Sequence, residues 1–580
     1  MKSPKFSCVS MLWRAGAAIA FAGLPIWQPA WAQESEPQPK PPQVDFSRAM
    51  AELRTTIEDE MQRGILTGVS VALIDGERTV FEGGFGWANR ERQVPAAADT
   101  LYRVGSISKL FTAVAVMQLV EAGKLDLDAP ITKWLPDFRI VDPFESASPI
   151  TLRQLMCHRS GMVRESPVGG YLDDRQPSPE QSIASLASCV LVNPPGSKTR
   201  YSNIGVTVEG QCAVAASGMS FEDYQMKYVL TPLGMTSSSW RADEQVRKKL
   251  AQGYMRVADD QGGFCFRPAP LFELGTIPAA NLYSSVSDIA RFCKMLLAGG
   301  KSGQETLLHS TSLALMSTPQ LTTNPNGFGL GFFVGRFGKY RTLQHTGAVY
   351  GFSTSVVAIP ELQIAVVVFA NDDIVMGPVD RISDTALELM RRAKTGEAVA
   401  SVPATVASNT EDLSRFAGDF ESSVHWAKIT LQDGALKLDL AGQPFTLRQI
   451  GPQSFEADGR FAYHAPVEFR ISADGVVNGF SALDQSFSRA KSDPPAIPDA
   501  WQAYLGSYGP DFIPVVISVH HGHLYAMTEN MIDYRLTPIN GSVFQMPEGL
   551  YADEELIFER DGQGAVHSAV LANMRLPRRP

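Results

Sequence analysis

The sequence has few of the residues from which metal centres and disulfide frameworks are built. It contains 6 cysteines and 9 histidines in 580 residues. Cys8 belongs to the N-terminal segment, and the spacings of the other five match neither a metal site nor a dense disulfide framework: Cys157, Cys189, Cys212, Cys265 and Cys293. We therefore expect no metal ion and no cofactor. Most of these thiols are expected to be buried and free, although one bridge stays open because pairing cannot be read from a sequence.

Basic residues are also in deficit. Lys and Arg number 51 against 61 Asp and Glu, so the net charge of −10 argues against a general nucleic-acid binder. The 44% of hydrophobic and 19% of charged residues are typical of a globular chain. A chain of 580 residues is too long for one compact core, so we expect about two to four domains.

Long apolar runs are almost absent, and both exceptions have a local explanation. The run at 15–27 follows three basic residues and precedes Ala30-Trp31-Ala32, the pattern of a signal peptide spanning residues 1–32. We therefore predict a periplasmic or secreted protein, with an uncleaved anchor as the alternative. The second run is interrupted by Pro360-Glu361, which favours two buried antiparallel strands over a membrane span.

The rest of the chain divides by composition. Residues 33–45 form a Pro-rich linker, and residues 46–393 have strand-like segments near both ends with helices between them. Asp75-Gly76 between two such segments indicates a hairpin. This order predicts an α/β domain in which helices flank an antiparallel sheet made by both ends of the domain, with a helical subdomain inserted. Residues 394–410 are a second linker by composition.

One pattern occurs twice in the C-terminal part. "FAGDFES" at Phe416 resembles "YLGSYGP" at Tyr504, and further landmarks recur at offsets of 87 to 89 residues, among them Phe469 and Phe558. Helical periodicity is missing from both copies, which consist of short strand-like runs and turns. We therefore expect residues 411–489 and 501–580 to be two small antiparallel β-barrels joined by the linker 490–500.

Ser106 and Lys109 stand at the start of a helical segment. Three residues are nearly one turn, so the two side chains share a face. Serine becomes a nucleophile when a neighbouring base takes its proton, and lysine can be that base when burial or nearby cations lower its pKa. The same spacing occurs at Ser488 and Lys491, where we interpret it as chance. The motif is therefore weak by itself.

Two further motifs carry functional groups. In Tyr201-Ser202-Asn203, an ionised tyrosine can act as a base and the asparagine amide can hold a substrate carbonyl. In His345-Thr346-Gly347, the glycine would let a substrate backbone approach a strand closely. A turn and a sheet edge also explain these residues, and the His-x-Gly pattern recurs at His520-His521-Gly522. Neither motif is specific by itself.

In this order and spacing, the three motifs resemble those of the serine β-lactamase-like family, which groups class C β-lactamases, penicillin-binding DD-peptidases and serine esterases. Connecting segments such as "GKLDLDAPITKWLPDF" and "NLYSSVSDIARF" resemble the family as well, over about residues 46–393. The resemblance implies a β-lactamase-like fold and a set of roles. Ser106 would be acylated, Lys109 and Tyr201 would move its proton, Asn203 would bind the substrate amide, His345, Thr346 and Gly347 would lie beside the substrate, and the backbone N–H groups of Ser106 and Ala348 would form an oxyanion hole.

His345 departs from the pattern of the family's β-lactamases, which usually have lysine there. Because histidine is mostly neutral at pH 7, it suits the carboxylate of a β-lactam less well. Histidine at this position resembles the D-aminopeptidase and esterase branches. Bacterial D-aminopeptidase also has two antiparallel barrels after its catalytic domain, a likeness of architecture only, and as a class it is not expected to carry a signal peptide.

We therefore expect an exported serine hydrolase that forms an acyl-enzyme on an amide or ester, foremost a D-aminopeptidase-like or DD-carboxypeptidase-like peptidase acting on a small molecule or short peptide. The alternatives are a β-lactamase or carboxylesterase, a penicillin-binding sensor that acylates without turnover, and a binding role for the C-terminal copies. We expect no nucleic-acid partner and no stable membrane span, and the oligomeric state stays open.

Overall fold

The computed structural model describes residues 44–146, 149–258, 264–397 and 413–580. Residues Asp45–Pro580 form one compact unit. The predicted signal peptide (1–32), nearly all of the first predicted linker (33–45) and most of the second (394–410) lie outside the described residues. Those three predictions therefore stay predictions.

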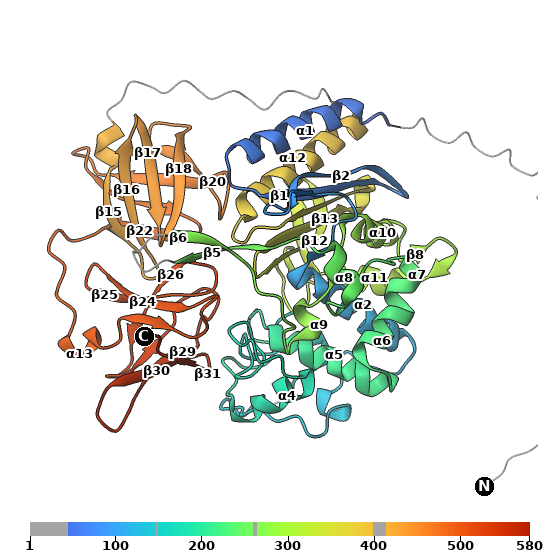
Figure 1. Ribbon diagram of the computed structural model, residues 1–580, viewed down its shortest axis with the longest axis horizontal. Helices are drawn as coiled ribbons and strands as arrows, with labels where there is room; N and C mark the ends of the chain where they lie inside the picture. The colour runs from blue at the N-terminus through green and yellow to red at the C-terminus, as the bar shows by residue number, and fades with distance from the viewer. Residues whose placement is uncertain (1–43, 147–148, 259–263, 398–412) are drawn as a thin grey trace, which may run out of the picture. The chain divides into compact units, whose positions relative to one another are not determined.

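A single antiparallel sheet positions the site. Its strands, in spatial order, are β10 (Gly327–Phe328), β11 (Phe333–Phe337), β12 (Tyr340–Val349), β13 (Phe352–Ile359), β14 (Ile364–Ala370), β1 (Gly68–Asp75), β2 (Arg78–Asn89) and β3 (Val94–Pro95). Since β1 pairs with β14, the early and late strands share one sheet, as predicted (Figure 1). Every residue of β13 and β14 is buried, which confirms that the interrupted apolar run forms two core strands joined through the short turn η5 (Pro360–Leu362).

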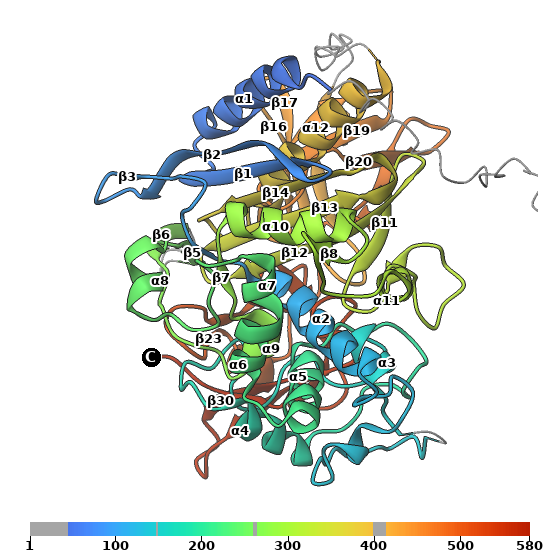
Figure 2. The same ribbon diagram turned by 90° about the vertical axis from the view of Figure 1, so that its right-hand side faces the viewer.

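Helices cover both faces of this sheet (Figures 1 and 2). Helices α1 (Ser47–Gln62) and α12 (Met376–Thr395) pack together on one face, and α10 (Val286–Leu297) packs on the other. In α12, apolar side chains at helical spacing are buried, among them Val379, Ile382 and Ala386. Helix α10 begins where the Ser285 side chain accepts a hydrogen bond from the Asp288 N–H, a regular N-cap.

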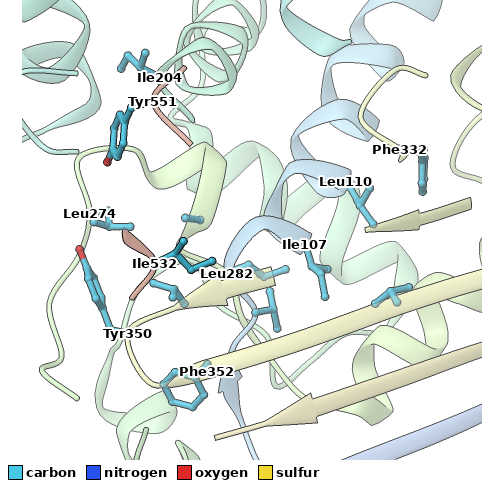
Figure 3. Packing of buried hydrophobic residues seen from close by; sticks show 14 of the residues in the cluster. Ile107, Leu110, Ile204, Leu274, Leu282, Phe332, Tyr350, Phe352, Ile532 and Tyr551 are labelled. Atoms are coloured by element: carbon cyan, nitrogen blue, oxygen red, sulfur yellow. The ribbon is translucent and has the colours of Figure 1, made fainter. Parts of the chain in front are cut away.

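Helix α2 (Ser108–Glu121) follows the predicted nucleophile and differs from its predicted form. The spacing of Leu110, Val114, Met117 and Val120 in the sequence suggests one apolar face, but all residues from Ser108 to Met117 are buried. A helix that is apolar all round lies inside a core rather than on a surface. Figure 3 shows Ile107 and Leu110 at the start of this helix within the main buried cluster, which also contains Leu282 and Phe332.

The remaining elements before residue 320 are short, except for the 15-residue helix α5. The helical ones are η1 (Gly105–Ile107), η2 (Ile131–Lys133), α3 (Leu152–Met156), α4 (Pro179–Ala184), η3 (Ser185–Ser188), α5 (Asn203–Ser217), α6 (Phe221–Gln225), η4 (Met226–Leu230), α7 (Thr231–Leu233), α8 (Glu244–Lys249), α9 (Ile277–Ala280) and α11 (Ser310–Met316). The strands form three pairs: β4 (Tyr102–Arg103) with β7 (Tyr283–Ser284), β5 (Tyr254–Ala258) with β6 (Phe264–Pro268), and β8 (Lys301–Ser302) with β9 (Glu305–Thr306). Together with α2, this part of the chain carries Ser106, Lys109, Tyr201 and Asn203 of the predicted site.

The first C-terminal copy is a closed barrel, as predicted. After η6 (Leu413–Phe416) it consists of β15 (Gly418–Glu421), β16 (Trp426–Gln432), β17 (Ala435–Leu440), β18 (Gln443–Gln449), β19 (Ser454–Gly459), β20 (Ala465–Ile471), β21 (Val477–Ala482) and β22 (Gln485–Arg489). Phe469 lies in its core beside Phe455, which recurs 89 residues later as Phe544, and the two ring centroids are 5.4 Å apart.

The second copy repeats this core but divides into two sheets. After α13 (Asp499–Gln502), the first sheet contains β23 (Gly506–Tyr508), β24 (Val515–His520), β25 (His523–Met527) and β26 (Asp533–Arg535), and the second contains β27 (Thr537–Pro538), β28 (Val543–Gln545), β29 (Glu555–Arg560), β30 (Val566–Leu571) and β31 (Met574–Pro577). A bridge between Tyr508 and Arg578 joins the sheets at one side. Phe544 and Phe558 lie 5.7 Å apart, matching the aromatic pair of the first copy.

The prediction about the cysteines is met within the described residues. The five cysteines there form no disulfide; four are buried and Cys265 is half-buried. Among the same residues, no helix is long and apolar enough to cross a bilayer.

Candidate active site

Ser106 lies in the short turn η1, directly before α2. Gly105 holds this turn with φ +55°, a conformation that favours glycine. A Cβ on Gly105 would lie 2.9 Å from the backbone nitrogen of Ala348 on β12. The serine turn and strand β12 are therefore packed backbone to backbone, and glycine permits the contact.

Lys109 lies one turn further on, fully inside the protein. Its Nζ donates to Ser106 Oγ at 2.9 Å, to Asn203 Oδ1 at 2.8 Å and to the Ala279 carbonyl at 2.9 Å. Burial, assisted by the nearby positive charge of Arg164, lowers the pKa of Lys109 to about 7, although Glu165 and Glu209 act in the opposite direction. The structure thus brings the predicted nucleophile and its proton partner together.

Tyr201 completes this group from the loop before α5. Lys109 Nζ lies 4.9 Å from the centroid of its ring. Burial raises the pKa of the tyrosine, an effect that the hydrogen bond with Ser106 and the charge of Arg164 only partly offset. A phenol with a raised pKa stays protonated at neutral pH, so it can pass a proton on but cannot start as the base.

His158 holds Tyr201 in place and was not predicted. Its ring stacks on that of Tyr201 with centroids 4.2 Å apart. Its carbonyl accepts the Arg200 N–H at 2.6 Å, and its Nδ1 accepts the Ser202 N–H at 3.2 Å. Burial, followed by the charge of Lys109, lowers the pKa of His158 well below its usual value, so the ring is neutral. Both neighbours of the tyrosine are fixed by this one residue.

Asn203 begins helix α5, with Ser202 as its N-cap. Its Oδ1 accepts the hydrogen bond from Lys109, and its Nδ2 donates to Glu165 Oε1. Burial raises the pKa of Glu165, while Arg164 and Asn203 counteract this effect. Both groups of the Asn203 amide are engaged inside the protein, so its predicted contact with a substrate stays a prediction.

His345 is buried on β12. Its Nδ1 lies 2.6 Å from the Thr346 carbonyl. Because a carbonyl only accepts, Nδ1 carries the proton and Nε2 presents a lone pair. Nε2 has no hydrogen-bond partner among the described residues. Burial and the charge of Lys109 lower the pKa of His345 to about 4, so this position is neutral at pH 7.

The three residues that follow His345 have different surroundings. Thr346 and Ala348 are exposed on β12, whereas Gly347 is buried. A Cβ on Gly347 would lie 2.1 Å from the Val104 carbonyl and 2.3 Å from Thr354 Oγ1. The backbone that lies close to Gly347 is therefore that of Val104, which precedes the serine turn. The glycine does not face the space where a substrate would lie.

A cavity of about 610 Å³ opens onto these groups. Five of the predicted site residues line it, whereas Lys109, Asn203 and Gly347 are not among its lining residues. The lining residues are Ser106, Arg164, Thr199, Arg200, Tyr201, Phe328, Phe333, Gln344, His345, Thr346, Ala348, Glu548, Gly549 and Leu550. The last three belong to the second C-terminal copy, which therefore supplies one wall of the cavity.

Several of these residues escaped prediction. Arg164 and Glu165 belong to the segment "HRSGMVRES" between α3 and α4, and no spacing rule marks them. Glu548, Gly549 and Leu550 lie more than 400 residues beyond the serine, in a loop without any catalytic motif. The residues set aside as chance matches lie elsewhere: Ser488 is in strand β22 and pairs with Glu421 of β15. No cluster of three or more His, Cys, Asp or Glu side chains in the described part of the chain is placed to hold a metal ion.

The chain resembles known proteins over most of this region. The family model described as Beta-lactamase matches residues 53–391. The chain is 26% identical over 512 residues to "Putative beta-lactamase-like 1" of Homo sapiens, which covers 84% of this chain and 94% of that protein. It is 24% identical over 320 residues, 55% of its length, to "Protein flp" of Staphylococcus aureus (strain MRSA252). It spans 62% of the length of that relative.

Two solved structures are also similar. The octameric penicillin-binding protein homologue from Pyrococcus abyssi superposes with a TM-score of 0.54 at 25% identity, over 76% of this chain and 99% of that one. The D-amino acid amidase from Ochrobactrum anthropi SV3, complexed with D-phenylalanine, superposes with a TM-score of 0.51 at 25% identity, over 60% of this chain and 100% of that one.

Proposed function

The chain belongs to the beta-lactamase family, and from that premise we propose that it hydrolyses small amides that carry a free amino group, as a D-aminopeptidase or D-amino acid amidase does. It is a serine hydrolase of the β-lactamase and penicillin-binding-protein type. The likeness to the D-amino acid amidase supports an amide substrate. The signal-like residues 1–32 support export to the periplasm or beyond the cell.

The proposed reaction begins at Ser106. Neutral Lys109, 2.9 Å away, takes the proton of Ser106 Oγ as the oxygen attacks the substrate carbonyl. With a pKa of about 7, Lys109 is neutral in about half of the molecules at pH 7. Tyr201 then passes a proton to the leaving amine, and water releases the acyl group by the reverse sequence.

The developing oxyanion requires two donors. The backbone N–H groups of Ser106 and Ala348 are the proposed pair, because both residues line the cavity and the serine turn lies against Ala348. Removing one such donor from a hydrolase typically costs about 100-fold to 1000-fold in kcat. Here both are backbone groups fixed by the packing of Gly105.

The observation that carries the proposal is the state of His345. A substrate carboxylate, as in a β-lactam or a C-terminal peptide, calls for a cation at this strand position, but the pKa of about 4 makes the ring neutral. Its Nε2 is instead a buried acceptor without a partner among the described residues, on a side chain that lines the cavity. A substrate amino group supplies the donor that this nitrogen requires.

A substrate panel tests the proposal. We expect D-phenylalanine amide to be cleaved with a kcat/KM at least about 10-fold above that of 3-phenylpropanamide, which lacks only the amino group, because that group satisfies His345.

Ser106→Ala should abolish turnover and labelling by a fluorophosphonate probe, whereas Ser488→Ala, which alters the other Ser-x-x-Lys copy, should leave both unchanged. Nitrocefin hydrolysis faster than any amino acid amide would contradict the proposal. A stoichiometric burst without turnover would point instead to a sensor.

A further inference from the structure

Arg164 occupies a partly buried position between the second C-terminal copy and the catalytic residues. Its carbonyl accepts the N–H of Asn203 at 2.9 Å and that of Ile204 at 3.3 Å, so it also fixes the start of α5. Its own N–H donates to Glu554 Oε1 at 3.0 Å. The main chain of this residue is therefore tied to the helix that carries Asn203 on one side and to the second copy on the other.

The Arg164 side chain is shared between two carboxylates. Its Nε lies 3.6 Å from Glu165 Oε1 and 3.5 Å from Glu529 Oε1, and the side chains of the three residues are 14%, 0% and 6% exposed. The second oxygens of Glu165 and Glu529 are buried without a hydrogen-bond partner among the described residues. Buried carboxylates in this state depend on the guanidinium for their stabilisation, and the guanidinium depends on them.

Glu529 belongs to the loop between β25 and β26 and is itself held. The Tyr551 hydroxyl donates to Glu529 Oε1 at 3.1 Å. Arg164 Cζ lies 5.9 Å from the ring centroid of Tyr551 and 5.6 Å from that of Tyr201. The guanidinium thus contacts one aromatic ring of the second copy and one of the active site. Figure 3 shows Tyr551 in the same buried cluster as Ile204 of α5.

The contacts continue without a gap to the nucleophile. Glu165 Oε1 accepts from Asn203 Nδ2, Asn203 Oδ1 accepts from Lys109 Nζ, and Lys109 donates to Ser106 Oγ. All of these groups except the serine are buried. We propose that Glu529 of the second C-terminal copy is a positioning residue for the hydrolysis. It attracts part of the positive charge of Arg164, so that Glu165 keeps its hydrogen bond with Asn203, and Asn203 in turn holds Lys109 in place. This inference rests on the proposed function of Ser106 and Lys109.

The charges around Lys109 fix the sign of the expected effect. The cation that faces it is Arg164, and the neutral rings that face it are His158 and His345. The acidic side chains that face it are Glu165 and Glu209. Around Arg164 stand Glu165, Glu529, Glu554, Tyr551 and Tyr201. Removing the charge of Glu529 draws Arg164 toward Glu165 and leaves more of its positive charge unbalanced. The pKa of Lys109 should then fall, because nearby positive charge disfavours its protonated form.

The test compares Glu529→Gln with Glu559→Gln, which removes a charge from the same copy at a surface pair with Arg575. The readout is the rate at which a fluorophosphonate probe labels Ser106 in the full chain, measured from pH 5 to 9. In Glu529→Gln we expect about a 10-fold slower reaction at pH 8 and an acid limb displaced to lower pH. Glu559→Gln should match the wild type. A rate within about twofold of the wild type and an unmoved acid limb would overturn the inference.

A second variant covers the case in which Glu529→Gln fails to fold. Tyr551→Phe removes only the hydroxyl that donates to Glu529, and we expect labelling about 2-fold to 5-fold slower with the same direction of the pH shift. Unchanged labelling in a folded Tyr551→Phe variant would then refute the inference. If the wild type is not labelled at Ser106, the proposed function fails instead, so the two failures are distinguishable.

Discussion

Each of the two C-terminal copies has an aromatic core of the same kind, but the corresponding loop has a different role in each copy. In the first copy, residues 460–464 connect β19 to β20, and Arg460 donates to the carbonyls of Ile65 and Asp373 beside the large sheet. In the second copy, the longer loop 546–554 connects β28 to β29, lines the active-site cavity and supplies Glu554 to Arg164. The corresponding loop thus supports the large sheet in one copy and forms a wall of the candidate active-site cavity in the other, since loops vary more readily than the strands they connect.

The strongest test of this difference between the two copies is to exchange their loops. Replacing residues 546–554 with residues 460–464 removes Tyr551, Glu554 and one wall of the cavity. We expect kcat/KM for an amino acid amide to fall about 100-fold, because Arg164 loses its support and displacements of about 1 Å at a catalytic group have effects of that size. Steady-state kinetics with a circular dichroism control would measure it. A folded chimera with full activity would show that the loop is not part of the site.

A substitution in the first copy should lower the stability of the protein and leave its turnover unchanged. Arg460→Ala removes two hydrogen bonds to partly buried carbonyls and a contact with the Phe266 ring, whose centroid lies 5.1 Å from Arg460 Cζ. We expect a loss of about 2 kcal/mol in the free energy of unfolding with kcat/KM unchanged. Denaturant unfolding and kinetics on the same preparation give both values, with the exposed Arg336 changed to Ala as the control. A fall in kcat/KM at unchanged stability would contradict this division.

The stability contributed by the contact between α12 and the first copy should depend on pH. Burial, followed by the negative charge of Asp384, raises the pKa of Asp380 to about 7, and the Tyr463 hydroxyl of the 460–464 loop donates to Asp384. Since the folded state keeps a proton that the unfolded chain releases near pH 4, this group makes stability fall as pH rises from about 4 to 7.

Asp380→Asn should therefore raise the melting temperature at pH 8 and narrow the difference between pH 5 and pH 8. Thermal unfolding of the variant and the wild type at both pH values measures the effect, with kcat/KM recorded to confirm that the active site is intact. An equal pH dependence in the two proteins would remove Asp380 from this account.

The smallest effect is expected at Asp553, in the same loop as Glu554 but at its surface. It pairs with Lys198 and Arg200, and its side chain is 40% exposed. Lys198 is exposed and Arg200 is buried, but the carboxylate itself is open to solvent. Ion pairs of an exposed carboxylate contribute about 0 to 1 kcal/mol, so Asp553→Asn should leave stability within that range and kcat/KM within about twofold. A loss as large as that of the loop exchange would mean that the surface pair, and not Arg164, anchors the loop.

The sequence predicts what depends on local pattern. The Asp75-Gly76 hairpin, the apolar spacing in α12 and the two β copies follow from periodicity and turn chemistry, and the structure contains them. The proximity of Ser106 and Lys109 follows from one helical turn and is also observed. The boundaries of the predicted domains stay predictions.

Long-range contacts leave no such pattern. Arg164 meets Glu529 across more than 300 residues, and neither position has a periodicity or motif that marks it. Gly347 shows a second limit: the sequence indicates that a backbone approaches this glycine, but only the structure shows that it belongs to Val104. The burial of α2 on all sides was missed for the same reason, since the partners that cover its second face come from distant segments such as α5 and α9.

The pairing of β1 with β14 has a consequence for how the chain is made. Residues 68–75 leave the ribosome long before residues 364–370, so strand β1 waits for its partner through the synthesis of the whole helical insertion. Contacts of such high sequence separation slow folding and leave a sheet edge open in the meantime. The apolar strands β13 and β14 arrive last and close that edge, so the interval before their arrival is when the chain is most exposed to pairing with other molecules.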